Sequence, residues 1–205
     1  MIRLVVFDVD GVLYHYDIEA RLAHLSGTTG IDPDEIHARV WRSGFEDAAD
    51  AGRYSDPDAY LQGFSEALGA PLSKADWIAA RKASVTPIPE SLNVVRRVAG
   101  RCAIAAFTNN GPLLKAEIAN ISPEMTVLFP GTFFTSAEFG VAKPDPLVYH
   151  RLADRCGLPP GSIYFIDDKP ENVDGALAAG YGGGHVFHTA GGMAGAIRAA
   201  GISLD

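Results

Sequence analysis

The stretch LVVFDVDGVL at residues 4–13 decides the fold, because it joins an uninterrupted apolar run to two carboxylates and a glycine. Four consecutive apolar residues without polar alternation predict a strand that is buried on both faces. Side chains alternate along a strand, so Asp8 and Asp10 point to the same side, about 7 Å apart. Two like charges this close repel one another unless a cation or a shared proton offsets them. The stretch therefore predicts a functional site beyond the carboxyl end of a central parallel strand.

Strand and helix patterns alternate over most of the remaining chain. We expect strands over residues 3–8, 102–107, 132–135, 162–166 and 184–187, and helices over 90–99, 112–119, 146–156, 170–180 and 193–200. Such alternation is typical of a largely parallel sheet with helices on both faces. We therefore predict an α/β fold with a Rossmann-like parallel sheet core.

Residues 15–86 break this alternation, because their apolar residues recur at helical spacing. We expect helices over 18–26, 33–43, 57–69 and 73–83, with Asp32-Pro33 and Asp56-Pro57 as helix-start signals. The segment TPIP at residues 86–89 predicts a stiff, non-helical return to the sheet. The prediction is an α-helical cap domain, residues 15–86, inserted into a core made of residues 1–14 and 87–205.

The amino-acid composition limits the classes of protein to which the chain can belong. The 205 residues, 47% of them hydrophobic, suffice for a sizeable core, and the net charge of −8 argues against a broad nucleic-acid surface. No apolar run reaches the ~18 residues that a membrane span needs, and residues 1–20 lack a signal-peptide pattern. Cys102 and Cys156 are predicted to be reduced thiols. We expect a cytoplasmic protein without nucleic-acid or membrane partners, and its oligomeric state stays open.

Four polar segments follow predicted strands, so all four are expected at the same edge of the sheet. They are DVDG at residues 8–11, TNNG at 108–111, AKPDP at 142–146 and DDKP at 167–170. Together they offer a nucleophile, hydroxyl and amide donors, a cation and additional acids. This set suits an anionic phosphoryl substrate together with a hard divalent cation.

These four segments, in this order and with a helical insert after the first, resemble the haloacid dehalogenase-like (HAD) hydrolase superfamily. The position of the insert is similar to that of the helical-cap subclass I. The DDKP segment with Asn172, and the TNNG segment, look most like sugar-phosphate phosphatases that act on compounds such as glucose 1-phosphate. The resemblance implies Mg²⁺-dependent hydrolysis of a small phosphate monoester, a sugar phosphate or similar metabolite, through an aspartyl-phosphate intermediate.

The resemblance also implies roles for the residues around the phosphoryl group. Asp8 is the expected nucleophile and a metal ligand. Asp10 is the expected general acid and base, with its backbone carbonyl on the metal. Thr108 and Asn109 are expected to bind phosphoryl oxygens, and Lys143 to neutralise charge shared by Asp8 and the phosphoryl group. Without the resemblance, Lys143 reads as a solvated surface lysine and Thr108 as the start of a turn.

The adjacent acids after the fourth strand are the expected metal ligands. Asp168 is implied to bind Mg²⁺ directly and Asp167 through water, while Asn172 orients the pair. The alternative is that both acids only favour the start of the following helix. Lys169 is predicted to belong to that helix start. Asn110 is expected to shape its turn.

Six weaker candidates could line the substrate pocket or simply belong to the packing and surface of the cap: Tyr14, His15, Trp41, Arg42, Phe45 and Glu46. Three other functions remain open. A phosphomutase shares the same motifs, and a non-catalytic phospholigand-binding protein could keep them without turnover. A 2-haloacid dehalogenase is disfavoured by Asp10, because a halide leaving group needs no proton.

Overall fold

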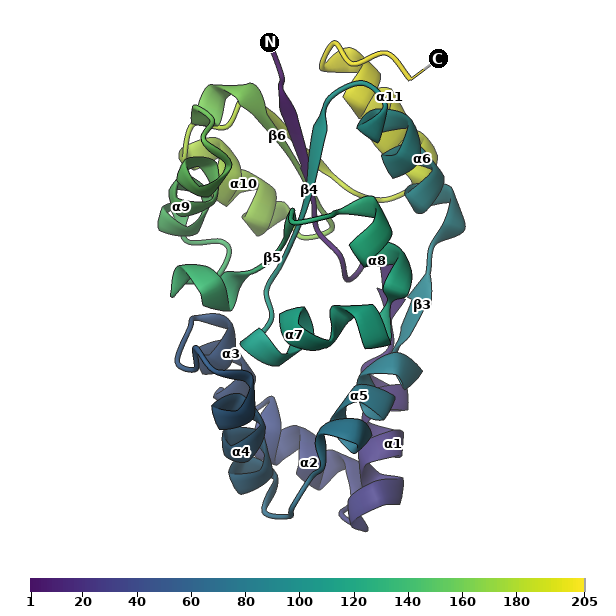
Figure 1. Ribbon diagram of the computed structural model, residues 1–205, viewed down its shortest axis with the longest axis vertical. Coiled ribbons are helices and arrows are strands. Elements are labelled where there is room, and N and C mark those ends of the chain that lie inside the picture. The colour runs from purple at the N-terminus through teal and green to yellow at the C-terminus, as the bar shows by residue number, and fades with distance from the viewer. Residues whose placement is uncertain (205) are drawn as a thin grey trace.

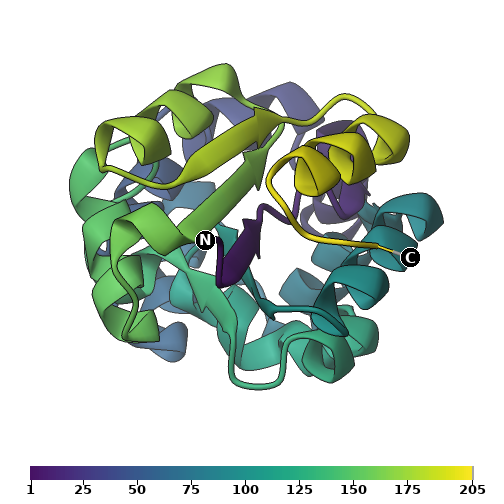
Figure 2. The same cartoon turned by 90° about the horizontal axis from the view of Figure 1, so that it is seen from above.

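The central sheet is parallel and has five strands, in the order β5-β4-β1-β6-β7 (Figure 2). The computed structural model describes residues 1–204. The strands are β1 (Leu4–Phe7), β4 (Ala103–Thr108), β5 (Phe133–Thr135), β6 (Ile163–Asp167) and β7 (Gly183–Val186). Strand β1 lies in the middle, with Leu4 opposite Ala103 of β4 and Ile163 of β6. The predicted α/β fold with a parallel sheet is confirmed.

Both faces of the sheet are covered, which explains why the core strands lack polar alternation. Val5 and Phe7 belong to one hydrophobic cluster and Leu4 and Val6 to another. The first cluster includes side chains of α6 (Pro89–Ala99), α7 (Pro112–Ile121), α8 (Pro123–Leu128) and α11 (Ala190–Ala199). The second includes side chains of α9 (Pro146–Cys156) and α10 (Pro170–Ala178). Helix α8 was not predicted.

A two-stranded ribbon connects the sheet to a group of helices. Strands β2 (Tyr14–Tyr16) and β3 (Val85–Pro87) are antiparallel, with Tyr16 opposite Val85. Between them lie α1 (Ile18–Thr29), α2 (Pro33–Val40), α3 (Phe45–Asp50), α4 (Pro57–Leu68) and α5 (Lys74–Ala83), at the bottom of Figure 1. We call residues 18–83 the helical insert. The sequence indicated neither the ribbon nor α3, and α2 ends three residues earlier than expected.

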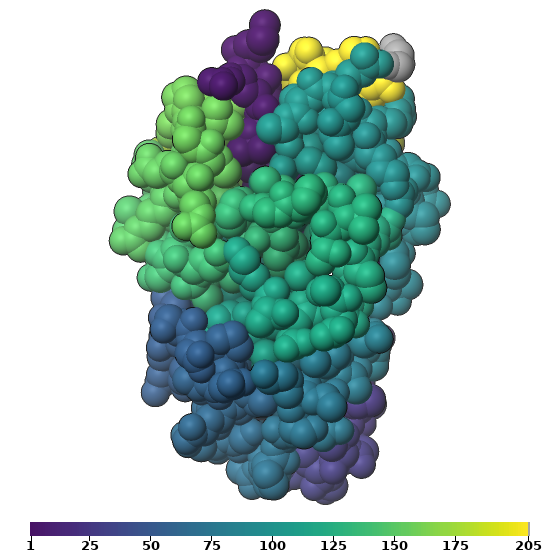
Figure 3. Space-filling view, in the orientation of Figure 1, coloured from purple at the N-terminus to yellow at the C-terminus, as the bar shows by residue number. Residues whose placement is uncertain are grey.

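The helical insert packs against the sheet-bearing part on the side where β1 and β4 end. Helices α4 and α5 contact α7, and α3 contacts the 3₁₀ helix η1 (Ser136–Phe139). Figure 3 shows the insert directly below α7. A second 3₁₀ helix, η2 (Pro160–Ser162), precedes β6. The two predicted helix caps are present, since Asp32 accepts from the Asp34 amide and Asp56 from the Ala59 amide.

Two smaller predictions can also be checked in the described part of the chain. Cys102 and Cys156 are both free thiols, as expected. No helix within residues 1–204 is both long enough and apolar enough to cross a bilayer.

Candidate active site

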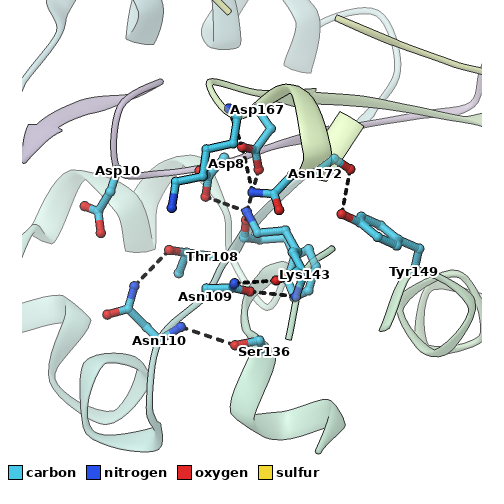
Figure 4. Close-up of polar contacts among 12 residues, drawn as sticks. Asp8, Asp10, Thr108, Asn109, Asn110, Ser136, Lys143, Tyr149, Asp167 and Asn172 are labelled. Carbon is cyan, nitrogen blue, oxygen red and sulfur yellow. Dashed lines mark hydrogen bonds and ion pairs between the residues drawn. The ribbon is translucent and has the colours of Figure 1, made fainter. Parts of the chain in front are cut away.

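The carboxyl edge of the sheet brings together residues from all four polar segments (Figure 4). Asp8 follows β1, Thr108 ends β4, Asp167 ends β6, and Lys143 lies on the loop between η1 and α9. All but Asp167 line one cavity of about 420 Å³, and Asp167 is fully buried beside Lys143. The predicted convergence of the segments is therefore present.

Lys143 is a buried cation that joins two of the carboxylates. Its Nζ lies 2.9 Å from Asp8 Oδ1 and 2.6 Å from Asp167 Oδ2, and it donates to the Phe107 carbonyl at 3.3 Å. The residue is only 5% exposed, which excludes a solvated surface lysine. Asn109 fixes its backbone, since Asn109 Oδ1 accepts from the Lys143 amide and Asn109 Nδ2 donates to the Lys143 carbonyl.

The charge balance of this group favours an additional cation. Burial raises the pKa of Asp8 to about 8, and Asp167 acts in the same direction, while the Lys143 ammonium opposes them. Burial alone would lower the pKa of Lys143, but Asp8 and Asp167 outweigh it and raise that pKa, so Lys143 stays charged. Burial and the neighbouring Asp167 raise the pKa of Asp168 as well. One ammonium thus faces three acidic groups, whose ionised forms a divalent cation would stabilise.

The three acids are close enough to share one metal ion. Asp8, Asp167 and Asp168 each place an oxygen within 4.8 Å of the other two. Asp168 Oδ1 is buried without a hydrogen-bond partner, and such an orphaned acceptor fits a cation as its partner. A Cβ at Gly11 would lie 2.5 Å from Asp168 Oδ2, so only glycine leaves room for this carboxylate. The donor set is all oxygen, which is what Mg²⁺ prefers.

The adjacent acids Asp167 and Asp168 do different things. Asp167 Oδ1 accepts from the Asn172 side-chain amide and the Lys169 backbone amide, both at 2.9 Å, and Oδ2 is held by Lys143. Asp167 therefore organises the loop, whereas Asp168 keeps a free oxygen. Lys169 is the residue that precedes the first turn of α10, as predicted for a helix start. Asn172 contacts Asp167, which agrees with an orienting role.

Thr108 presents its hydroxyl to the cavity from a buried position. Its Oγ1 accepts from Asn110 Nδ2 at 2.9 Å, so its own proton is available for a ligand. The Asn110 backbone amide in turn donates to Ser136 Oγ at 3.3 Å. Asn110 thus does more than shape the turn, because it orients the Thr108 hydroxyl.

The helical insert and the ribbon supply the opposite wall of the cavity. Of the weaker candidates, Trp41 and Glu46 line it. Arg42 instead donates to the Asp34 carbonyl, and Phe45 is buried among aromatic rings. Tyr14 and His15 lie outside the lining, Tyr14 buried and His15 exposed. Sequence reasoning missed five residues of this wall: Tyr16, Arg21, Asp47, Asp50 and Arg81.

Arg81 holds the carboxylate of Asp10. Its Nη2 donates to Asp10 Oδ2 at 2.6 Å and to Oδ1 at 2.8 Å, and its guanidinium lies 4.8 Å from the ring centre of Tyr16. Arg81 is 3% exposed and comes one helical turn after the buried Trp77. An arginine on the apolar stripe of an amphipathic helix is the signal that could have identified it. The Asp10 carboxylate stands outside the Asp8–Asp167–Asp168 group.

Arg21 is a second buried cation in this wall. Its guanidinium lies between two indole rings, 5.2 Å from Trp41 and 5.4 Å from Trp77. It donates to the Tyr16 hydroxyl at 3.2 Å and lies 3.8 Å from Glu46. Its orientation is therefore fixed before any ligand binds.

Comparisons with known proteins agree with this geometry. A family model described as a haloacid dehalogenase-like hydrolase matches residues 2–180. A phosphatase from Mycobacterium tuberculosis is 29% identical over 192 residues, which cover 87% of this chain and 84% of the relative.

Solved structures of similar fold include two kinds of enzyme. A HAD family enzyme from Bacteroides thetaiotaomicron, in complex with magnesium and inorganic phosphate, matches with a TM-score of 0.74 at 18% identity, over 92% of this chain and 95% of the other. L-2-haloacid dehalogenase from Xanthobacter autotrophicus matches with a TM-score of 0.62 at 25% identity, over 89% of this chain and 76% of the other.

Proposed function

The chain belongs to the haloacid dehalogenase-like hydrolase family, whose model matches residues 2–180, and we propose that it is a magnesium-dependent phosphatase of small phosphate monoesters. The observation that carries the proposal is the buried Asp8–Lys143 ion pair at the floor of a cavity that Asp10 also lines. Groups that can serve as nucleophile, cation and acid/base thereby lie in one place. The phosphatase name of the M. tuberculosis relative supports the same reaction.

In the first half-reaction, an oxygen of Asp8 forms a bond to phosphorus while the phosphorus–oxygen bond of the ester breaks. The leaving oxygen keeps the electron pair of that bond and takes a proton from the carboxyl group of Asp10. The product is an aspartyl-phosphate on Asp8 and a free alcohol.

In the second half-reaction, a water oxygen bonds to phosphorus and the bond from phosphorus to Asp8 breaks, returning its electron pair to the Asp8 carboxylate. Asp10, now a carboxylate, takes a proton from the water. One carboxyl group therefore serves as acid and then as base, and it ends in the state in which it started.

Positive charge and hydrogen-bond donors stabilise the transferring phosphoryl group. Lys143 lies 2.9 Å from Asp8 and offsets charge on both the nucleophile and the phosphoryl oxygens. The Thr108 hydroxyl and the Asn109 backbone amide would donate to those oxygens. Mg²⁺, held by Asp8, Asp168, the Asp10 carbonyl and, through water, Asp167, would supply further positive charge there.

The wall that the insert contributes to the cavity suits a leaving group with several hydroxyl groups, such as a sugar. Buried guanidinium donors, carboxylate acceptors and an indole ring share this wall, and hydroxyl groups can bind to all three. The cavity of about 420 Å³ has the size usual for small-molecule sites. Residues 15–86 would act as a cap over the core of residues 1–14 and 87–205, moving on the β2–β3 ribbon to admit substrate and exclude water.

Phosphate release from sugar phosphates, nucleotides and phosphoglycolate, with and without Mg²⁺, tests the proposal. We expect activity that requires Mg²⁺ and that falls at least about 10³-fold in Asp8→Asn, which lacks the nucleophile. Asp154→Asn, an exposed acid on α9, is the matched control and should keep wild-type activity. Equal activity of wild type and Asp8→Asn would contradict the proposed nucleophile.

The same assay separates the other functions of this family. A mutase consumes substrate with little release of free phosphate, and a non-catalytic protein releases none. The structural similarity to a haloacid dehalogenase makes chloride release from 2-chloropropionate a necessary additional measurement. Chloride release without phosphatase activity would replace the proposed reaction with dehalogenation.

A further inference from the structure

Within residues 1–204, a single ion pair connects the helical insert to the rest of the chain, and it lies in the candidate site. This pair joins Arg81 of α5 to Asp10, while the other ion pairs of the insert stay within it. Both side chains line the cavity. The orientation of Asp10 is therefore set by a residue of the insert and not by the loop of β1 alone.

The hydrogen bonds of this pair fit one half of the reaction better than the other. Arg81 Nη2 donates to both oxygens of Asp10, so both oxygens act as acceptors. The carboxylate form of Asp10, which the proposed reaction reaches once the leaving group has taken the proton, can accept from Arg81 with both oxygens, and this is the form that takes a proton from water. Building on the function proposed above, we infer that Arg81 is a positioning residue that holds Asp10 as the base for hydrolysis of the phosphorylated Asp8.

Arg81 is well fixed for such a role. It is 3% exposed, and the ring of Tyr16 lies 4.8 Å from its guanidinium. Tyr16 belongs to β2, so the ribbon and α5 fix the guanidinium together. If the Asp10 side chain turned away from Arg81 to protonate the leaving group, the buried guanidinium would lose its partner. This favours return of the Asp10 side chain to Arg81 as soon as the leaving group has gone.

The two half-reactions can be measured separately with p-nitrophenyl phosphate, whose leaving group departs without a proton. The ratio kcat/KM reports the steps up to departure of p-nitrophenolate, and kcat also includes hydrolysis of the phosphoenzyme. In Arg81→Met we expect kcat to fall about 10- to 100-fold, the size of a misplaced catalytic group. We expect kcat/KM to stay within about 3-fold, with a burst of p-nitrophenol close to one equivalent per site.

Two further variants serve as controls. Lys82→Met removes the same charge from the next, exposed position of α5 and should leave both constants unchanged. Arg81→Lys keeps the charge and should recover part of the lost kcat. An equal fall of kcat and kcat/KM in Arg81→Lys would overturn the inference, because it would indicate damage to the whole site.

A double-mutant cycle with Asp10→Asn tests whether Arg81 acts through Asp10. If it does, Arg81→Met causes no further loss of kcat in the Asp10→Asn protein, whereas additive losses would overturn the inference. Failure of the inference about Arg81 and failure of the proposed function give different experimental results. Wild type without phosphate release contradicts the function, while an active wild type with an unchanged Arg81→Met variant contradicts only the role of Arg81.

Discussion

Gly11 brings the backbone close to the expected metal ligand Asp168. Its φ of +87° belongs to the left-handed region, and an added Cβ would lie 2.5 Å from Asp168 Oδ2. We expect Gly11→Ala to displace Asp168 and to weaken Mg²⁺ binding about 10- to 100-fold, as loss of support for a metal ligand typically does. Titration calorimetry with Mg²⁺ measures this.

Gly30→Ala is the control for backbone strain. Gly30 has a φ of +73° and nothing within 4 Å of an added Cβ, so its substitution costs conformational strain of about 1–2 kcal/mol and nothing else. The Mg²⁺ affinity of the Gly30→Ala variant should equal that of wild type. Similar losses of affinity in both variants would mean that contact with Asp168 is not the cause.

Asp50 makes stability depend on pH. Burial, and the neighbouring Glu46 and Asp47, raise its pKa well above the ordinary 3.8. Between these two pKa values the folded protein holds a proton that the unfolded chain has lost, so this group lowers stability as pH rises. Asparagine does not titrate. We therefore expect Asp50→Asn to be more stable than wild type by about 1 kcal/mol at pH 8.

Urea unfolding at pH 5 and pH 8 measures this difference. The advantage of Asp50→Asn should shrink at pH 5, where the wild-type carboxyl is closer to its neutral form. The exposed Asp154→Asn should show the same small effect at both pH values. An advantage of Asp50→Asn that does not depend on pH would exclude titration as its origin.

Some residues of the candidate site were identified from local sequence patterns, and others were missed. Asp8, Thr108 and Lys143 could be located because each lies in a short segment at the end of a strand or between strands, where backbone topology alone brings them together. Arg21 and Arg81 were missed, because they come from helices whose packing over the site is a tertiary property. Their placement on buried helix faces was the available local signal.

At the level of elements, the β2–β3 ribbon is the clearest feature that the sequence did not reveal. Each strand has three residues, too few for a periodic pattern, and β3 ends in Pro87, which argues against a strand. The ribbon forms because the chain leaves and re-enters the core at adjacent points, so that Tyr14 comes opposite Pro87. This is long-range pairing, which local propensity does not encode.

Close backbone contact between the turn that follows α3 and the end of η1 makes a second glycine critical. An added Cβ at Gly52 would lie 2.5 Å from the Gly140 Cα and 3.1 Å from the Ala137 carbonyl oxygen, and backbone cannot move aside as a side chain can. Since Gly52 has a φ of +85°, close to that of Gly30, Gly30→Ala again isolates the strain. We expect Gly52→Ala to cost about 1–3 kcal/mol more than Gly30→Ala, the usual cost of overpacking.

Denaturant unfolding of Gly52→Ala and Gly30→Ala measures the difference in stability between them. The KM of each variant for the best substrate measures the effect on substrate binding. Because α3 carries Glu46, Asp47 and Asp50 of the cavity wall, movement of α3 should also raise KM. Equal stability and equal KM in the two alanine variants would show that the α3–η1 contact adjusts freely.

At the scale of the whole molecule, alternation of strands and helices predicted the core well because its central strands β4, β1 and β6 are buried on both faces. The helical periodicity of residues 15–86 likewise located α1, α2, α4 and α5 of the insert, but not α3. A cytoplasmic location and the lack of nucleic-acid and membrane partners stay predictions from composition. The oligomeric state stays open, because neither periodicity nor net charge encodes it.

Metal binding should couple to the stability of the entire fold, since its expected ligands follow two different strands. Asp8 and Asp168 come from the ends of β1 and β6, and the unfolded chain does not hold them together. Mg²⁺ at 100 times its Kd should therefore add about 2.7 kcal/mol to the free energy of unfolding. For a domain of this size that corresponds to a rise in Tm of roughly 5–11 °C.

Asp168→Asn should raise the Tm of the metal-free protein and reduce the rise in Tm that Mg²⁺ causes. Without metal, removing one of three mutually repelling carboxylates should raise Tm, because Asp168 is partly buried beside Asp167 and its pKa is raised by that environment. With Mg²⁺, the variant lacks a charged ligand, so most of the metal-dependent rise should disappear. Thermal unfolding of both proteins over a Mg²⁺ series, at constant ionic strength with KCl, measures the two effects together. An undiminished Mg²⁺-dependent rise in Asp168→Asn would place the stabilising ion elsewhere and remove the carboxylate cluster from the metal site.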